Sequence, residues 1–394
     1  MKILVIGNVF DLAHSLPTKY SHFLDFVSDC IRYSSDEEQA FQIEHNQYFE
    51  ETRQRYPELY DEYMELIANN RLLEHFLRIY KDRCRDGKEG WIDFENEIAY
   101  IIKSLEIALK EYLKQNEEGK EEISFRPQCV DRIVRELLLI GGEGSGYGII
   151  VPESFKDGRV DAILGDLNRI TRLLELYLVD YVENLEITCR LPEFENAEIT
   201  HVLSFNYTDT YRKLYDPDRS AKYCYIQGFA RGNESVDTCS LVLGVDESSL
   251  NACGDEDNTF VWFKKFYQRI YKETDSEYID WLNEYERVQN AMPKASLPQV
   301  DLYIYGHSLD VTDRDALRYL ILWPKMTTHI FYYNRRDFSE KVRNLVRVIG
   351  KEELIRRTRG RHRTIRFHTT GAFETINEDE EMGASIDTFS RYLD

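Results

Sequence analysis

The sequence predicts an α/β protein in which a mostly parallel sheet is interrupted by a large all-helical insertion. Short apolar runs occur at the start of the chain and again beyond residue 200, and several are apolar throughout. Such runs are typical of strands buried on both faces of a parallel sheet. Between the first run and the second lie roughly 190 residues with helical periodicity and almost no strand pattern.

Seven runs are expected to be strands. They are KILVIG (2–7), HVLSFN (201–206), KYCYIQ (222–227), SLVLGV (240–245), DLYIYG (301–306), THIFYYN (328–334) and TIRFHTT (364–370). After residue 200 the runs alternate with helical segments, which is the pattern of an α/β domain. Because the first run must join the same sheet, the domain is expected to be discontinuous.

The expected α/β domain comprises residues 1–34 and 196–375, and residues 35–195 form the helical insertion domain. The glycine-rich run at 141–148 is expected to be a surface loop. Residues 376–394 form an acidic C-terminal tail. The insertion is expected to act as a lid or oligomerisation scaffold, because long amphipathic helices bury their apolar faces against something.

The net charge of −21 argues against non-specific binding of nucleic acid and of anionic membranes, except through the basic stretch 356–366. A solvated turn leading into a last strand is the favoured interpretation of that stretch, and a partner contact is the alternative. The seven cysteines show no CxxC pair or zinc-like spacing, so we expect reduced thiols. There is no apolar run of about 18 residues, as a membrane span would need. The chain is therefore expected to be cytoplasmic.

Polar residues follow four of the expected strands, at the edge where ligands of open α/β sheets bind. They are Gly7, Asn8, Asp11 and His14; Asn206, Tyr207, Thr208 and Asp209; Gln227 and Gly228; and Gly306, His307, Ser308 and Asp310. Taken singly, each group could cap a following helix. Their joint occurrence at one sheet edge favours a binding site.

Other chemistries have little local support in the sequence. Asp310, Asp313 and Asp315 could hold a hard cation, but acidic residues are common at helix N-termini, so no metal is expected. The turn after the first strand suits a phosphate, although Val9 stands where a dinucleotide fingerprint has its second glycine.

These motifs resemble the bacterial abortive-infection AbiH family, whose members typically begin with a strand leading into G-N-G-F-D-L-A-H-G-L-P-T. The corresponding stretch Gly7–Tyr20 departs from it at two glycines, replaced by Val9 and Ser15. The resemblance continues in order through most of the chain. It includes Trp91-x-Asp93-x-Glu95, Ser204–Thr208, Leu243–Glu247, FKKFYQRIYKET, WL at 281–282 and Gly306–Asp310.

The family is distantly similar to sirtuin-type, Rossmann-like NAD-binding domains, and this resemblance implies the roles of individual residues. Gly7, Asn8 and Asp11 would line the phosphate and ribose region of NAD or a related nucleotide. Asn206 would orient water or ribose at the glycosidic bond. Ser308 and Asp310 would lie near the adenosine half. The remaining residues implied for nucleotide binding are His14, Thr18, Gly228 and Gly306.

The implied reaction is hydrolysis of the nicotinamide–ribose bond, in which a His accepts a proton from the ribose hydroxyls. Gln227 stands where the family usually has that His, and loss of a positioned base typically costs about 10²–10⁴ in rate. His307 or His14 could replace it, so Asn206, Gln227 and His307 are the catalytic candidates. The alternative is a nucleotide-binding sensor or regulatory subunit without turnover. Partners would be the nucleotide and either a second copy or another defence protein.

Overall fold

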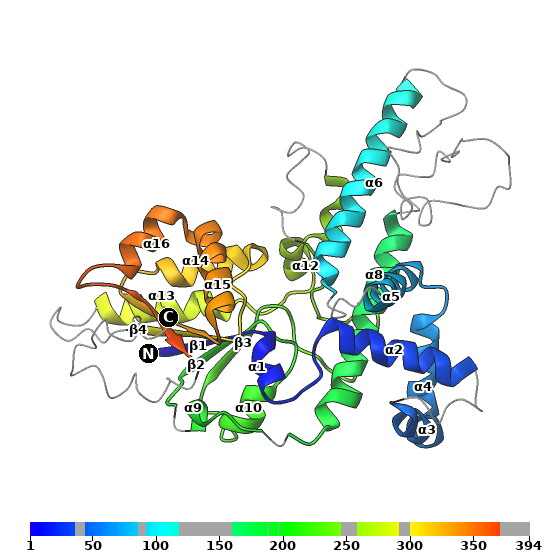
Figure 1. The fold of residues 1–394 in the computed structure, drawn as a ribbon, viewed down its shortest axis with the longest axis horizontal. Coiled ribbons are helices and arrows are strands. Elements are labelled where there is room, and N and C mark those ends of the chain that lie inside the picture. Colours follow the sequence, from blue (N-terminus) through cyan, green and yellow to red (C-terminus); the bar gives the residue numbers. More distant parts are fainter. Residues whose placement is uncertain are drawn as a thin grey trace. The chain divides into compact units, whose positions relative to one another are not determined.

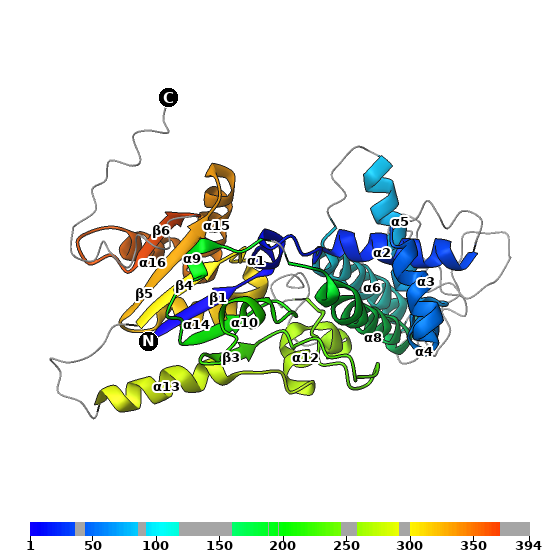
Figure 2. The same cartoon turned by 90° about the horizontal axis from the view of Figure 1, so that it is seen from below.

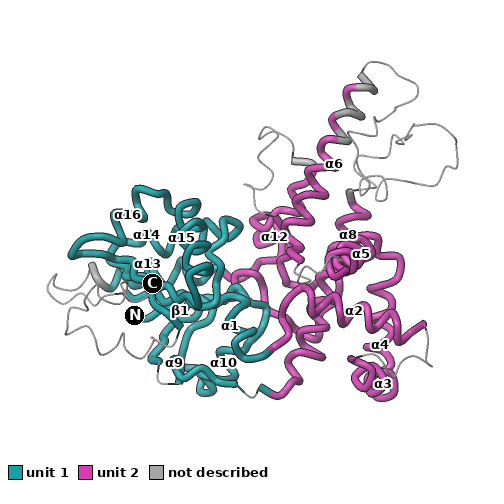
Figure 3. The backbone as a smooth tube through the Cα atoms, in the orientation of Figure 1, with its two compact units in different colours: residues 1–15, 187–224, 276–394 teal, residues 16–186, 225–275 magenta. Residues whose placement is uncertain are grey.

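The structure is a computed structural model that describes residues 1–35, 44–85, 92–117, 160–187, 189–195, 197–245, 258–290 and 300–370. The chain forms two compact units (Figure 3). Unit 1 comprises residues 1–15, 187–224 and 276–394, and unit 2 comprises residues 16–186 and 225–275. The expected loop at 141–148 and the acidic tail 376–394 lie outside the described residues.

Unit 1 contains a six-stranded parallel sheet of order β3-β2-β1-β4-β5-β6, which confirms the predicted α/β class (Figures 1 and 2). The strands are β1 Lys2–Ile6, β2 His201–Ser204, β3 Lys222–Tyr225, β4 Val300–Tyr305, β5 Met326–Tyr332 and β6 Ile365–Thr369. The order is that of doubly wound dinucleotide-binding domains. A shared order establishes the fold but not the function.

The helices of unit 1 lie in the connections between these strands. They are α1 Asn8–Ala13, α9 Pro192–Glu195, α10 Thr210–Tyr215, α13 Glu277–Asn290, α14 Arg314–Leu322, α15 Arg335–Ile349 and α16 Lys351–Thr358. One face of the sheet presents Leu4 and Ile6 to a cluster that includes Phe10 of α1, Phe194 of α9 and Tyr211 of α10. Because β1 is buried on both faces, its residues are apolar without alternation.

Unit 2 contains the helices of the insertion together with one helix from residues 225–275. They are α2 Tyr20–Ser35, α3 Asn46–Arg55, α4 Pro57–Ile67, α5 Arg71–Arg85, α6 Phe94–Glu117, α8 Val160–Leu176 and α12 Lys265–Tyr271. Phe26 of α2 packs against Phe49, Tyr63 and Tyr177, with ring centroids 4.9–5.7 Å apart. These aromatic contacts place α2 in the helical unit, so the boundary falls at residue 16 rather than 35.

Unit 2 also includes residues 225–275, which the sequence had suggested would belong to the α/β domain. A buried ion pair on α8 binds this segment. The Arg172 guanidinium pairs with Glu175 at 2.8 Å and donates to the carbonyls of Arg231 and Gly232, while Glu175 accepts from Arg231 N–H at 3.0 Å. The spacing of apolar residues carries no information about hydrogen bonds between a charged side chain and the backbone. The sequence therefore does not show that residues 225–275 belong to unit 2.

The prediction of a strand at 240–245 is wrong. Leu241, Val242 and Leu243 are buried, as the apolar run suggested, but they pair with no neighbouring strand. Instead, the side-chain amide of Gln268 accepts from Leu243 N–H and donates to the Leu243 carbonyl, both at 3.0 Å. A side-chain amide can satisfy the same backbone groups as a neighbouring strand. The composition of the run therefore does not show which of these two partners its backbone binds.

Candidate functional site

The carboxyl ends of β1, β2 and β4 meet at the point where the strand order reverses. In the register of the sheet, Ile6 lies beside Ser204 on one side and beside Tyr305 on the other. The residues that follow these strands are therefore neighbours within unit 1. In doubly wound sheets, ligands bind in the crevice at this switch point.

The glycines of this edge are required by a close approach of two turns. A Cβ on Gly7 would lie 2.7 Å from Cα of His307 and 2.8 Å from the Gly306 carbonyl oxygen. Gly306 has φ +70°, and a Cβ there would lie 2.5 Å from the nitrogen of Phe10. The packing of β1's turn against β4's turn thus accounts for both glycines without a ligand.

The first N–H groups of α1 bind protein carbonyls. Val9 N–H donates to Gly306 O at 3.2 Å, and Phe10 N–H donates to Gly7 O at 2.8 Å. A phosphate at this turn would compete with these bonds. Val9 is an ordinary helical residue, so its branched side chain carries no strain, whereas Ser15 has φ +62°, where a glycine is favoured.

Two polar contacts join β1's turn to the segment after β2. Asn206 Nδ2 donates to the Gly7 carbonyl at 3.1 Å, and Thr208 Oγ1 donates to Asp11 Oδ2 at 2.6 Å. Asn206 is only 5% exposed, and its Oδ1 has no hydrogen-bond partner among the described residues. A buried acceptor without a partner costs about 1–3 kcal/mol and calls for an explanation.

His14 makes structural hydrogen bonds through both ring nitrogens. Nδ1 lies 2.7 Å from the Phe10 carbonyl, which can only accept, so Nδ1 carries the proton. The Tyr215 hydroxyl accepts from Leu191 N–H at 2.6 Å and lies 2.7 Å from Nε2, to which it donates. Burial lowers the pKa of His14, consistent with this neutral form. His14 therefore helps to hold α1 rather than offering a free base.

His307 is bound in the same way at the end of β4. Its Nδ1 accepts from Leu309 N–H at 2.9 Å, so the neutral ring carries its proton on Nε2. Nε2 lies 3.5 Å from Asp313 Oδ2, and Phe205 packs edge-on against the ring at 4.3 Å. Both nitrogens are engaged, so His307 would have to break a contact to accept a proton.

The turn after β4 is held by residues that the sequence analysis did not select. Lys341 of α15, only 3% exposed, donates to the His307 carbonyl at 2.8 Å, and Asn344 Nδ2 donates to the Ser308 carbonyl at 2.9 Å. Burial lowers the pKa of Lys341. Lysine and asparagine ordinarily face solvent on a helix, but the position of Lys341, four residues before Leu345 and seven before Val348, lies on the apolar stripe of α15. Asp310 accepts from Thr312 N–H at 3.0 Å, the capping role considered as its alternative.

Ser308 and Asn8 are exposed at this edge, beside the buried groups described above. Gln227, Gly228 and Thr18 belong to unit 2. There Gly228 has φ +83°, and a Cβ on it would lie 2.2 Å from the Ser240 carbonyl oxygen. Unit 1 therefore brings together the candidates from β1, β2 and β4 only.

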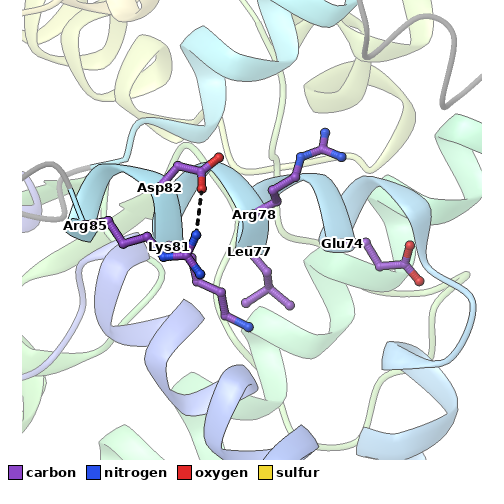
Figure 4. A pocket seen from close by; sticks show the side chains of 6 residues that line it. All are labelled: Glu74, Leu77, Arg78, Lys81, Asp82 and Arg85. Atoms are coloured by element: carbon purple, nitrogen blue, oxygen red, sulfur yellow. Dashed lines mark ion pairs between the residues drawn. The ribbon is translucent and has the colours of Figure 1, made fainter.

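Within the described ranges, no group of three or more His, Cys, Asp or Glu side chains could hold a metal ion. Nor does any helix in those ranges have the length and apolar character needed to cross a membrane. A cavity of about 300 Å³ lies along α5 of unit 2, lined by Glu74, Leu77, Arg78, Lys81, Asp82 and Arg85 (Figure 4). It contains none of the candidate residues.

Of the motif Trp91-x-Asp93-x-Glu95, Trp91 lies outside the described residues. Asp93 accepts from Asn96 N–H at 3.2 Å at the start of α6, and Glu95 pairs with buried Lys265 of α12 at 2.8 Å. Both carboxylates thus stabilise the helical unit.

Comparison with known proteins gives a single informative result. No curated protein and no solved structure matches the chain. The family model described as bacteriophage abortive infection AbiH matches residues 3–333, which is most of the chain. The resemblance read from the motifs is thereby confirmed, and the chain belongs to the bacteriophage abortive infection AbiH family.

Proposed function

We propose that this protein binds NAD or a related nucleotide at the carboxyl ends of β1, β2 and β4. Its family membership supports a role in bacteriophage abortive infection. The observation that carries the nucleotide proposal is Asn206, whose buried Oδ1 has no partner among the described residues although its Nδ2 is fixed on Gly7. A ribose hydroxyl or a bound water would satisfy that acceptor.

The surroundings of Asn206 suit the ribose part of such a ligand. The Asp11 carboxylate is buried beside the Thr208 hydroxyl, and carboxylates accept hydrogen bonds from ribose hydroxyls in dinucleotide sites. Exposed Ser308 and Asn8 add hydrogen-bonding groups at the rim. The phosphates would have to compete for the N–H groups of α1 or bind elsewhere, so the ribose contacts carry more of the proposal than the glycine turn.

Binding without efficient hydrolysis is the version we favour. His14 and His307 have both ring nitrogens engaged, and Gln227 cannot act as a base near neutral pH. Hydrolysis of the nicotinamide–ribose bond is the second candidate. In its favour, the free Asn206 acceptor could orient an attacking water, although catalysis without a positioned base would be about 10²–10⁴ slower.

Isothermal titration of the purified protein with NAD tests the binding proposal, with free nicotinamide and ADP-ribose followed in parallel. Asn206→Ala should weaken NAD binding at least tenfold, while Asn233→Ala, at an exposed position in unit 2, should leave it unchanged. Heat of binding on addition of NAD, with no free nicotinamide released, supports the binding role. Nicotinamide release that Asn206→Ala abolishes would establish the enzyme instead, and no binding by a folded protein would refute both.

Gln227→His separates the two versions further. The family resemblance, and not the geometry of unit 1, names position 227 as the position of the base, so nicotinamide release by this variant alone would support that assignment. If both proteins bind NAD and neither releases nicotinamide, the missing base is not the sole cause of inactivity.

A further inference from the structure

One part of unit 1 has a charge opposite to that of the whole protein. Residues 335–366, comprising α15, α16 and the approach to β6, contain twelve Lys and Arg against four Asp and Glu, a net charge of +8. The complete chain has a net charge of −21. The positive charge is therefore concentrated in one short segment, and the overall balance does not describe its local field.

Some of these cations have structural roles. Arg356 and Arg357 both pair with Glu353, whose pKa their hydrogen bonds lower to about 2. Arg357 also donates to the carbonyls of Ile321 and Leu322 at the end of α14. These side chains are accounted for by the fold.

Six other cations in the segment are different. All are solvent-exposed, and none forms an ion pair or side-chain hydrogen bond within the described ranges. Two of them lie on α15, and the other four follow it in the chain. They are Arg343, Arg347, Lys351, Arg359, Arg361 and Arg363. Arginines left without carboxylate partners on an otherwise acidic protein are available to an anionic partner.

The positions of these cations suit a row of phosphates. Arg343 and Arg347 lie four residues apart on α15, which is one helical turn of about 5.4 Å. Lys351 begins α16, which packs between α15 and β6, and Arg359, Arg361 and Arg363 follow it in the α16–β6 connection (Figures 1 and 2). The charges thus extend along one continuous stretch of chain instead of converging on a single point.

We infer that this surface, the exposed cations of residues 343–363, binds the phosphodiester backbone of nucleic acid without base specificity. Arginine forks match phosphate oxygens bidentately. At physiological ionic strength the Debye length is about 8 Å, so the more distant acidic surface is largely screened from a strand on this segment. A flat anionic membrane would bring more of the acidic protein close to lipid charges, which favours a narrow strand as the partner.

The cations of this surface are not among the residues of the proposed nucleotide site, and its test does not depend on that proposal. Fluorescence anisotropy of labelled 30-nucleotide single strands and 30-base-pair duplexes, of DNA and of RNA, is measured from 50 to 300 mM NaCl. We expect dissociation constants of about 10⁻⁴–10⁻⁶ M that weaken steeply with salt. The triple change Arg359→Gln, Arg361→Gln and Arg363→Gln should reduce the slope of log K against log salt by about 2 to 3.

The matched control makes the same change of net charge elsewhere. Arg55→Gln, Arg71→Gln and Arg85→Gln replace three exposed arginines of unit 2 and should leave both affinity and slope unchanged. Equal losses in the two triple variants would show a general charge effect and overturn the proposal. So would the absence of binding at 50 mM NaCl, or co-sedimentation with phosphatidylserine vesicles by a protein that binds none of the four nucleic acids.

Discussion

Acid should detach the edge strand β6 through the titration of His368. His368 Nε2 lies 3.0 Å from Nδ1 of His329 on β5, so the two nitrogens can share one proton but cannot both carry one. Burial, with the positive charges of His329, Arg366 and Arg363 adding to it, lowers the pKa of His368 from 6.5 to about 3. On the other side of His329, Nε2 lies 3.8 Å from Oδ1 of Asp301.

The sign and size of the effect follow from linkage. Because the folded pKa of His368 lies below its unfolded value, the neutral ring stabilises the fold fully above pH 6.5, and this contribution is lost as the pH falls toward about 3. At pH 4.5, two pH units below the pKa of His368 in the unfolded chain, the free energy of unfolding is lower by up to about 2.7 kcal/mol. Since the ring is partly exposed, we expect about 2 kcal/mol, or a roughly 30-fold larger opening constant.

Hydrogen exchange of the amides of β5 and β6, corrected for intrinsic rates, measures this opening at pH 7 and pH 4.5. Comparison with His368→Gln removes the contribution of other titrating groups. On acidification, the opening free energy of β6 in the starting protein should fall by about 2 kcal/mol relative to that in the variant. His362→Gln, at an exposed position nearby, should behave like the starting protein. Identical pH dependence of β6 protection with and without His368 would refute the reasoning.

Three substitutions in unit 1, with Gly165→Ala in unit 2 as a control, test the packing at and beside the site. Gly7→Ala places a Cβ 2.7 Å from backbone and should destabilise the protein by about 1–3 kcal/mol in urea unfolding, whereas Gly165→Ala, on α8 with no heavy atom within 4 Å of the new Cβ, should stabilise it by about 0.5–1 kcal/mol. Ser15→Gly should raise stability by about 0.5–1 kcal/mol by relieving φ +62°, and an unchanged melting temperature would contradict this. Lys341→Met leaves the His307 carbonyl without its donor and should cost about 1–3 kcal/mol, whereas retention of full stability would show that water replaces the amine.

Most of the sheet could be predicted from the sequence because its strands are buried on both faces. β1, β4 and β5 are apolar over most of their length, whereas an amphipathic helix of the same length is apolar on one face only. The run at 240–245 has the same composition, but Gln268 binds both backbone groups of Leu243, 25 residues away, and Val245 forms only an isolated bridge with Lys264. Composition reports burial of a segment, whereas its hydrogen-bond partner depends on the tertiary structure.

The candidate site was predictable in position but less so in the roles of its residues. Gly7 was expected to line the phosphate and ribose region, and Gly306 was expected to belong to the nucleotide site; the structure shows that each makes room for the other's turn. Both uses require the same residue, so the sequence alone cannot separate them. Lys341 was missed because a lysine on an amphipathic helix ordinarily faces water, and its contact with His307 connects positions 34 residues apart.

The hydrogen-bonding states of the histidines limit any catalytic mechanism for unit 1. Besides His14 and His307, its histidines lie away from the carboxyl ends of β1, β2 and β4: His201 begins β2, His329 and His368 pair across β5 and β6, and His362 precedes β6. In the described part of unit 1, carboxylates are then the remaining bases to consider, and Asp11 is held by Thr208, two residues after Asn206. A carboxylate base would make nicotinamide release persist at pH 5, where an imidazole base would be largely protonated. If NAD hydrolysis occurs, its pH profile therefore distinguishes a carboxylate base from a histidine freed by ligand binding.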